Sequence, residues 1–77
     1  MSKKSAADLE KISATVAAGR FEELPNPLLT EEAAVVARRS VPTMKRLCQN
    51  GTVRAVKFGG IWNINRDALL RYAGLTQ

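Results

Sequence analysis

Histidine is absent from this chain of 77 residues, and cysteine occurs once, as Cys48. Without histidine the chain cannot build a His–carboxylate metal site or a Ser–His or Cys–His catalytic pair, and a single cysteine cannot form an intrachain disulfide. Acidic residues are also few, with seven in total. We therefore expect a protein that is not an enzyme and that holds no metal ion or cofactor.

Long apolar segments are missing as well. The longest uncharged stretches, residues 12–19 and 58–65, have eight residues each, whereas a membrane-spanning helix needs roughly twenty apolar residues. Lys3-Lys4 resembles the basic start of a signal peptide, but charged residues interrupt the segment that follows. The sequence thus predicts no membrane association and a cytoplasmic location, with which a single free thiol agrees.

The residues that are present suit one small domain. The hydrophobic fraction of 45% is that of an ordinary globular protein, although a chain this short buries only about 60% of the surface that it exposes when unfolded. We expect an N-terminal helix with a proline-containing linker at residues 1–27, followed by the main domain at residues 28–77.

Positive charge is concentrated in one part of the chain. The net charge of +5 combines −2 over residues 1–32, +7 over residues 33–66 and zero over residues 67–77. The middle segment has no acidic residue, and its cations are Arg38, Arg39, Lys45, Arg46, Arg54, Lys57 and Arg66. Such a segment is typical of a surface that faces a polyanion. The alternatives are a basic face that only keeps the protein soluble, or one that binds an acidic protein.

The N-terminal segment predicts a helix over residues 6–18. Residues 5–8 have the pattern of a capping box, apolar residues follow at helical spacing, and Gly19 ends the helix. The apolar stripe is narrow and rich in alanine, so this helix must pack on the rest of the chain, pack on a partner, or fray. Two prolines exclude a helix from residues 24–27, which form the linker.

The main domain is predicted to begin with a helix that Thr30 caps and that stops near Arg38-Arg39. Leu29 and Ala34 have the spacing of a hydrophobic staple around that cap.

A second helix is predicted over residues 41–50. Ser40 caps it, Pro42 lies in the first turn, where its missing N–H is tolerated, and Gly51 ends it in the left-handed conformation. The residues that helical spacing turns toward the core are Met44, Leu47 and Cys48. The residues on the outer side are Val41, Pro42, Thr43, Lys45, Arg46 and Gln49.

A β-hairpin follows, with strands at residues 52–58 and 61–65 joined by Gly59-Gly60. Val56 and Phe58 share one face, as do Trp62 and Ile64, with the register open by one residue. The residues that this leaves near the solvent face or the tip are Arg54, Lys57, Ile61 and Asn63.

A last helix begins at Arg66-Asp67 and ends at Gly74, which completes a mainly α fold with a small β-hairpin and an N-terminal helix. Several segments carry a resemblance: Leu28-Leu29-Thr30-Glu31-Glu32-Ala33-Ala34, Ser40-Val41-Pro42-Thr43, Gly59-Gly60-Ile61-Trp62 and Asp67-Ala68-Leu69. In this order and spacing, over residues 28–73, they resemble the excisionase-type, MerR-like winged helix–turn–helix domain. Two departures are Arg38-Arg39, where many members have glycine and valine, and Lys45, where many have an aromatic residue. We therefore expect a tight or strained turn between the two helices.

The resemblance implies a DNA interface, because the second helix of a helix–turn–helix enters the major groove. The implied contact residues are Ser40, Val41, Pro42, Thr43, Lys45, Arg46 and Gln49 in that helix, Arg38 and Arg39 in the turn, and Arg54, Lys57, Gly59 and Gly60 in the wing. Lys45 or Arg46 would contact guanine, or else only phosphate. Thr43 would contact phosphate or a thymine methyl group, and Gln49 would read adenine or face only solvent. The two glycines allow close approach to a sugar–phosphate backbone or a minor groove, or serve only the turn.

Three further residues have competing interpretations. Trp62 is expected in the core rather than stacked on a base. Cys48 is expected as a small apolar filler. Arg66 is either a phosphate contact or a surface residue at a helix start.

The resemblance also implies a function, that of a bacteriophage excisionase, or recombination directionality factor. Such a factor would bind tandem repeats of attachment-site DNA cooperatively, bend the DNA, and direct an integrase (a tyrosine or serine recombinase) toward excision. Self-association on DNA would be head-to-tail or dimeric, with the N-terminal helix as the candidate contact. The alternative is a small winged-helix repressor of the same fold.

Overall fold

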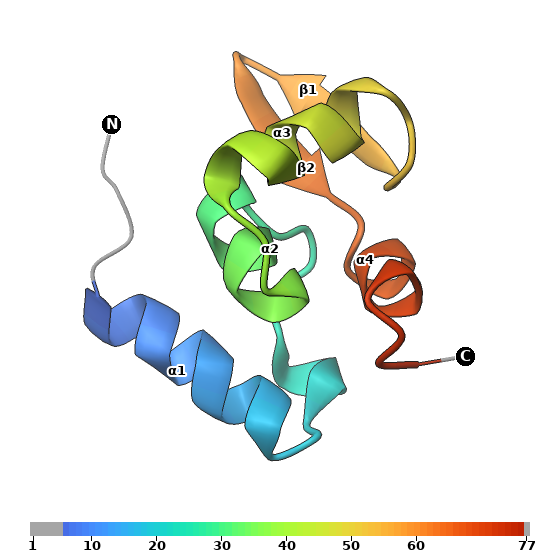
Figure 1. The fold of residues 1–77 in the computed structure, drawn as a ribbon. Helices are drawn as coiled ribbons and strands as arrows, with labels where there is room; N and C mark the ends of the chain where they lie inside the picture. Colours follow the sequence, from blue (N-terminus) through green and yellow to red (C-terminus); the bar gives the residue numbers. More distant parts are fainter. Residues whose placement is uncertain (1–5, 77) are drawn as a thin grey trace.

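The computed structural model describes residues 6–76, which form four α-helices, a short 3₁₀ helix and one two-stranded antiparallel hairpin (Figure 1). In chain order the elements are α1 (Ala6–Ala17), η1 (Phe21–Glu23), α2 (Thr30–Ala37), α3 (Val41–Gln49), β1 (Ala55–Phe58), β2 (Ile61–Ile64) and α4 (Arg66–Tyr72). The predicted mainly α architecture with a hairpin and an N-terminal helix is confirmed, and the order of elements is compatible with a winged helix. Within residues 6–76, no helix has the length and apolar character needed to cross a membrane.

The N-terminal helix packs on the main domain. α1 lies against α2, at the opposite end of the molecule from the hairpin, and its Ile12 and Val16 side chains pack onto the core (Figure 1). Gly19, expected to end the helix, follows α1 in the left-handed conformation with a φ of +74°. Leu24, in the linker, is only 3% exposed. Residues before and after position 27 therefore share one core. The predicted cap residue Ser5 lies outside the described residues.

The core lies where α2, α3, β2 and α4 meet. Its largest fully buried side chains are those of Leu28, Met44, Val53, Ile64 and Leu69. Leu28 also extends the sheet, because its N–H and C=O groups each form a 2.9 Å hydrogen bond with the backbone of Ile64. The end of the linker is thereby fixed to β2.

Arg66 joins the linker to the last helix. Its Nη1 donates to the carbonyl oxygens of Glu22 and Leu24 at 3.2 and 3.1 Å, and its backbone N–H donates to Asn26 Oδ1 at 3.3 Å. Its Nε also pairs with Asp67 Oδ1 at 3.4 Å. The guanidinium is therefore held by the chain itself at the start of α4, which favours the structural interpretation of this residue.

The first helix of the main domain, α2, begins at Thr30. If Thr30 were the cap, the helix would begin at residue 31. Thr30 is already the first helical residue, and Leu29 is the cap, because the chain is still extended at Leu29 after its neighbour has paired with β2. The Glu32 carboxylate accepts a hydrogen bond from the Leu29 N–H at 2.9 Å and so satisfies one free amide of the helix start. The prediction that Thr30 caps this helix is wrong.

The hairpin has a single register, set by its two-residue turn. Gly59 and Gly60 both have positive φ, +60° and +79°, as a type I′ turn requires. The pairs, from the base to the tip, are Ala55 with Ile64, Val56 with Asn63, Lys57 with Trp62, and Phe58 with Ile61. The paired residues share a face, so the face of Trp62 and Ile64 also holds Lys57, and the opposite face holds Phe58.

This register corrects the expected packing of the first strand. Val56 and Phe58 are 66% and 78% exposed, because they lie on the face that points away from the core. The strand is also shorter than predicted. Asn50 Oδ1 accepts the Thr52 N–H at 2.9 Å, and the Val53 N–H donates to the Leu47 carbonyl at 3.2 Å, so the chain is still turning there.

Candidate nucleic-acid interface

The outer face of α3 is a continuous exposed stripe. Helical spacing of three and four residues puts Pro42, Lys45, Arg46 and Gln49 on one side, and all four are exposed. The opposite side carries Met44 and Cys48, which are 0% and 5% exposed, and half-buried Leu47 packs beside them. The inward residues of this helix are therefore as predicted, and the outer stripe carries two cations and one amide.

Val41 differs from the expected arrangement. Helical spacing predicts it on the outer side, but it is half-buried and packs against the core, one turn before Met44. Its position at the first turn of the helix explains this, because a residue three before a buried one faces the same way.

The start of α3 is held by two hydroxyl side chains. Ser40 Oγ accepts the Thr43 N–H at 3.3 Å, as expected of a cap, and also donates to Thr43 Oγ1 at 2.8 Å. The helix ends at Gln49, and Gly51 follows two residues later in the left-handed conformation, with a φ of +79°. Thr43 is half-buried beside this cap.

The turn between α2 and α3 has an unusual conformation. Arg38 is left-handed, with φ 56° and ψ 47°, and is the one non-glycine residue with positive φ among residues 6–76. The conformation allows the Arg39 N–H to donate to the Ala34 carbonyl at 3.0 Å. A side chain in this region costs about 1–2 kcal/mol. The predicted strain of the turn is confirmed, and both arginines are exposed beside the start of α3.

The hairpin carries its two cations on opposite sides. Lys57 lies on the face of Trp62, with Nζ 5.7 Å from the centroid of the indole ring. Arg54 precedes the strand by one residue, and its carbonyl accepts the Asn65 N–H at 2.9 Å, which continues the ladder. Alternation along the strand therefore directs Arg54 to the face of Val56. Trp62 is half-buried and packs against the core, as expected.

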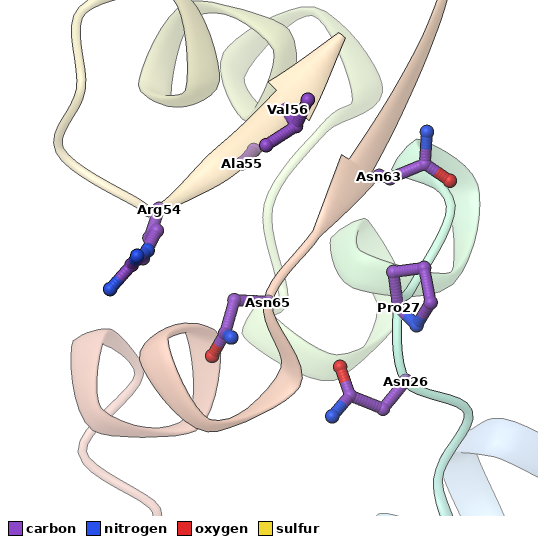
Figure 2. Close-up of a pocket in the computed structure, with 7 residues that line it drawn as sticks. All are labelled: Asn26, Pro27, Arg54, Ala55, Val56, Asn63 and Asn65. Carbon is purple, nitrogen blue, oxygen red and sulfur yellow. The ribbon is translucent and has the colours of Figure 1, made fainter. Parts of the chain in front are cut away.

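A shallow pocket of about 220 Å³ lies at the base of the hairpin, between β1, β2 and the linker (Figure 2). The residues that line it are Asn26, Pro27, Arg54, Ala55, Val56, Asn63 and Asn65. Its three amide side chains already have local partners: Asn65 Oδ1 caps α4 by accepting the Ala68 N–H at 2.8 Å, Asn26 accepts from Arg66, and Asn63 donates to the Ile61 carbonyl at 3.2 Å. The amides of Asn26 and Asn65 therefore hold the linker and the hairpin to the start of α4, and the amide of Asn63 bonds within β2.

The charges of the molecule are separated in space. Of the seven cations in residues 33–66, all but Arg66 are exposed. None of these six forms an ion pair with a carboxylate of the described residues. The acidic side chains lie on α1, η1 and the start of α2, with Asp67 at the start of α4. In Figure 1, α1 and η1 are at the end of the molecule away from the hairpin. The turn, α3 and the hairpin therefore carry exposed charge of one sign, and we call these three elements with their six cations the cationic surface.

Three apolar side chains are exposed on the hairpin: Ile61 lies near the tip as expected, whereas the exposure of Val56 and Phe58 differs from the expected packing. Val56, Phe58 and Ile61 are 66%, 78% and 41% exposed, and all three lie on the hairpin face opposite Trp62. A fixed two-residue turn at Gly59-Gly60 would have been enough to find them, since it pairs Phe58 with Ile61 and so separates both from the face of Trp62.

The remaining titratable and ligating groups offer no other site. Burial raises the pKa of the Cys48 thiol, which stays protonated and packs as an apolar side chain. Residues 6–76 contain no cluster of three or more side chains of the kinds that hold a metal ion.

Comparison with protein-family models gives no match, and neither a curated protein nor a solved structure matches the chain. Inferences about function therefore rest on the residues and their geometry.

Proposed function

We propose that this protein is a sequence-specific DNA-binding protein with a winged helix–turn–helix fold, and that it acts as an excisionase. The observation that carries the proposal is the cationic surface, in which one helix, the turn before it and one hairpin carry six exposed cations that form no ion pair with a carboxylate of residues 6–76. Duplex DNA is the polyanion with a groove wide enough to take such a helix.

In this proposal α3 is the recognition helix. Lys45 and Arg46 lie on its exposed stripe, with side chains long enough to reach guanine O6 and N7 or the flanking phosphates. The Thr43 hydroxyl and the arginines of the turn, Arg38 and Arg39, contact the backbone at the start of the helix. Gln49, one turn after Lys45 and Arg46, faces the same groove.

The hairpin is the wing. Lys57 and Arg54 lie on opposite sides of it, and its Gly59-Gly60 tip has no side chain that would prevent close approach to DNA. The molecule measures 31 by 30 Å across its two long axes, close to one turn of B-DNA, which is about 34 Å. A single copy thus suits about one helical turn, with the helix and the wing in neighbouring grooves.

One copy with so small an interface would bind weakly, so function is expected from several copies on tandem repeats of attachment-site DNA. A head-to-tail arrangement agrees with the separation of charge between the two ends of the molecule. The apolar stripe of α1 packs on its own core, so contact with a neighbour would use the outer side of α1. The assembly would bend DNA and direct an integrase toward excision in the cytoplasm.

The experiment that tests this proposal uses duplexes selected for binding from a random-sequence pool. Lys45 and Arg46 are replaced together by alanine, Lys57 is replaced by alanine in a second variant, and Arg71→Ala is the matched control, because Arg71 is an exposed cation on α4, outside the cationic surface. We expect both test variants to bind at least about tenfold more weakly, which is about 1.4 kcal/mol, and the control to bind as the wild type does. Unchanged binding by both test variants would refute the interface. Binding without bending would favour the small repressor.

A further inference from the structure

The end of the hairpin carries an apolar cluster that the fold does not use. Phe58 and Ile61 form the cross-strand pair next to the turn, and Val56 lies on the same face two residues before Phe58. They are the exposed large hydrophobic side chains among the described residues, and Phe58 has 78% of its surface in water. A two-residue turn requires only its glycines, and Trp62 and Ile64 on the other face provide the packing. The cluster therefore needs an explanation outside the core.

A second copy of this chain is a poor occupant for the cluster. Three side chains of this size present roughly a few hundred Å² of apolar surface, whereas a stable protein–protein interface buries about 800 Å² on each partner. The surface around the cluster is also cationic, since Arg54 lies on the same face and Lys57 on the opposite one. Two such surfaces would repel each other.

The surroundings instead specify an anionic partner with a narrow apolar slot. A whole two-stranded ribbon needs the width of the major groove, but this hairpin narrows at its tip to Phe58, Ile61 and two glycines. The minor groove of B-DNA is about 6 Å wide and bordered by one phosphate backbone on each side, and it can take a single apolar side chain. A hairpin with one cation on each face matches that border of charge. Inside the minor groove, the flat faces of the stacked bases provide the apolar surface that the cluster could contact.

We propose that Phe58, supported by Ile61, inserts between two base pairs from the minor groove and kinks the duplex. This inference rests on the proposed function, because it assumes that the cationic surface binds DNA. Apolar wedges of this kind unstack one base step and bend the duplex toward the major groove. Arg54 and Lys57 then lie over the two backbones, and the bend brings the DNA further around α3.

The test uses a duplex of about 30 base pairs, selected from a random-sequence pool, with 2-aminopurine introduced at successive positions and a dye at each end. The wild type is expected to raise the 2-aminopurine fluorescence at one base step and to shorten the end-to-end distance. Phe58→Ala removes both signals and weakens binding about tenfold, since one stacked aromatic is worth about 1–3 kcal/mol. Phe58→Leu keeps a partial wedge and an intermediate bend. Because the side chain is exposed, the melting temperature of either variant is expected to equal that of the wild type, so a loss of signal is not a loss of folding.

Two controls separate this inference from the proposed function. Val56→Ala changes the same face two pairs further from the tip and is expected to leave the unstacking signal unchanged. The Lys45→Ala, Arg46→Ala double variant weakens binding but bends the DNA that it still holds. A wild type that fails to bind any selected duplex would overturn both proposals. A wild type that binds while Phe58→Ala bends and unstacks the duplex equally would overturn the wedge alone. Loss of cooperativity on tandem sites, with bending retained, would assign the cluster to a protein contact and equally overturn the wedge.

Discussion

The ammonium group of Lys57 lies over the indole ring of Trp62, with Nζ 5.7 Å from the ring centroid. These two residues are paired across the hairpin, so the contact fixes Lys57 on the face that packs against the body of the protein. An exposed cation–π contact of this kind is worth about 0.5–1 kcal/mol. It keeps one cation of the wing in position and leaves its charge accessible from solvent.

This contact makes the only tryptophan of the chain a reporter of DNA binding. We expect the emission of Trp62 to change saturably as duplex DNA is added, because a phosphate that pairs with Lys57 draws the ammonium away from the ring. Lys57→Met should alter the emission of the free protein and abolish most of the change on binding. Arg46→Ala should weaken the affinity and keep the full amplitude. Equal amplitudes in the wild type and in Lys57→Met would show that Lys57 does not approach DNA.

The left-handed Arg38 predicts a substitution that raises stability and lowers affinity. Glycine adopts this conformation without the clash of a Cβ atom, so Arg38→Gly should increase the free energy of unfolding by about 1 kcal/mol. It also removes one cation beside α3, so DNA binding should weaken. Arg39→Ala is the matched control, because it removes a neighbouring exposed cation that does not have positive φ. Urea unfolding checks the stability, and a destabilised Arg38→Gly would refute the account of the turn.

Cys48 predicts a loss of stability in alkaline solution. Burial raises the pKa of this thiol above its ordinary value of 9.0, so the folded state retains the proton more strongly than the unfolded state. The protonated Cys48 thiol therefore stabilises the folded state fully at a pH below its ordinary pKa. This stabilisation is lost as the pH rises through the pKa that the thiol has in the folded state. Unfolding by urea at pH 8 and pH 10 should therefore show a larger decrease for the wild type than for Cys48→Ala. If the free energy of unfolding fell equally in the wild type and in Cys48→Ala, burial would not change the pKa of this thiol.

Local signals account for most of the fold that the sequence predicted. Ser40 caps α3, Gly51 ends it, and Gly59-Gly60 form the hairpin turn, because caps and tight turns act over three or four residues. The pairing of Leu28 with β2 and the bonds from Arg66 to the linker carbonyls were not predictable in this way. Residues about forty positions apart make these contacts, and no local pattern signals them.

The face of the hairpin on which Phe58 lies was predicted wrongly for a different reason. The expectation grouped residues by alternation along each strand but did not carry the register across the turn. A two-residue turn pairs positions 58 and 61, so Phe58 and Trp62 must lie on opposite faces. The start of α2 was missed for a third reason, since the long-range pairing of Leu28 moved the cap from Thr30 to Leu29.

The central claim is that the cationic surface binds duplex DNA, and the salt dependence of binding tests it most directly. Each phosphate that a cation neutralises releases counterions, so four to six contacts predict a slope of about −4 to −5 in a plot of log affinity against log salt concentration. The measurement is a titration of a selected duplex from about 50 to 200 mM NaCl, followed by the anisotropy of a labelled DNA. A slope in that range would support the account. A flat response to salt would contradict it.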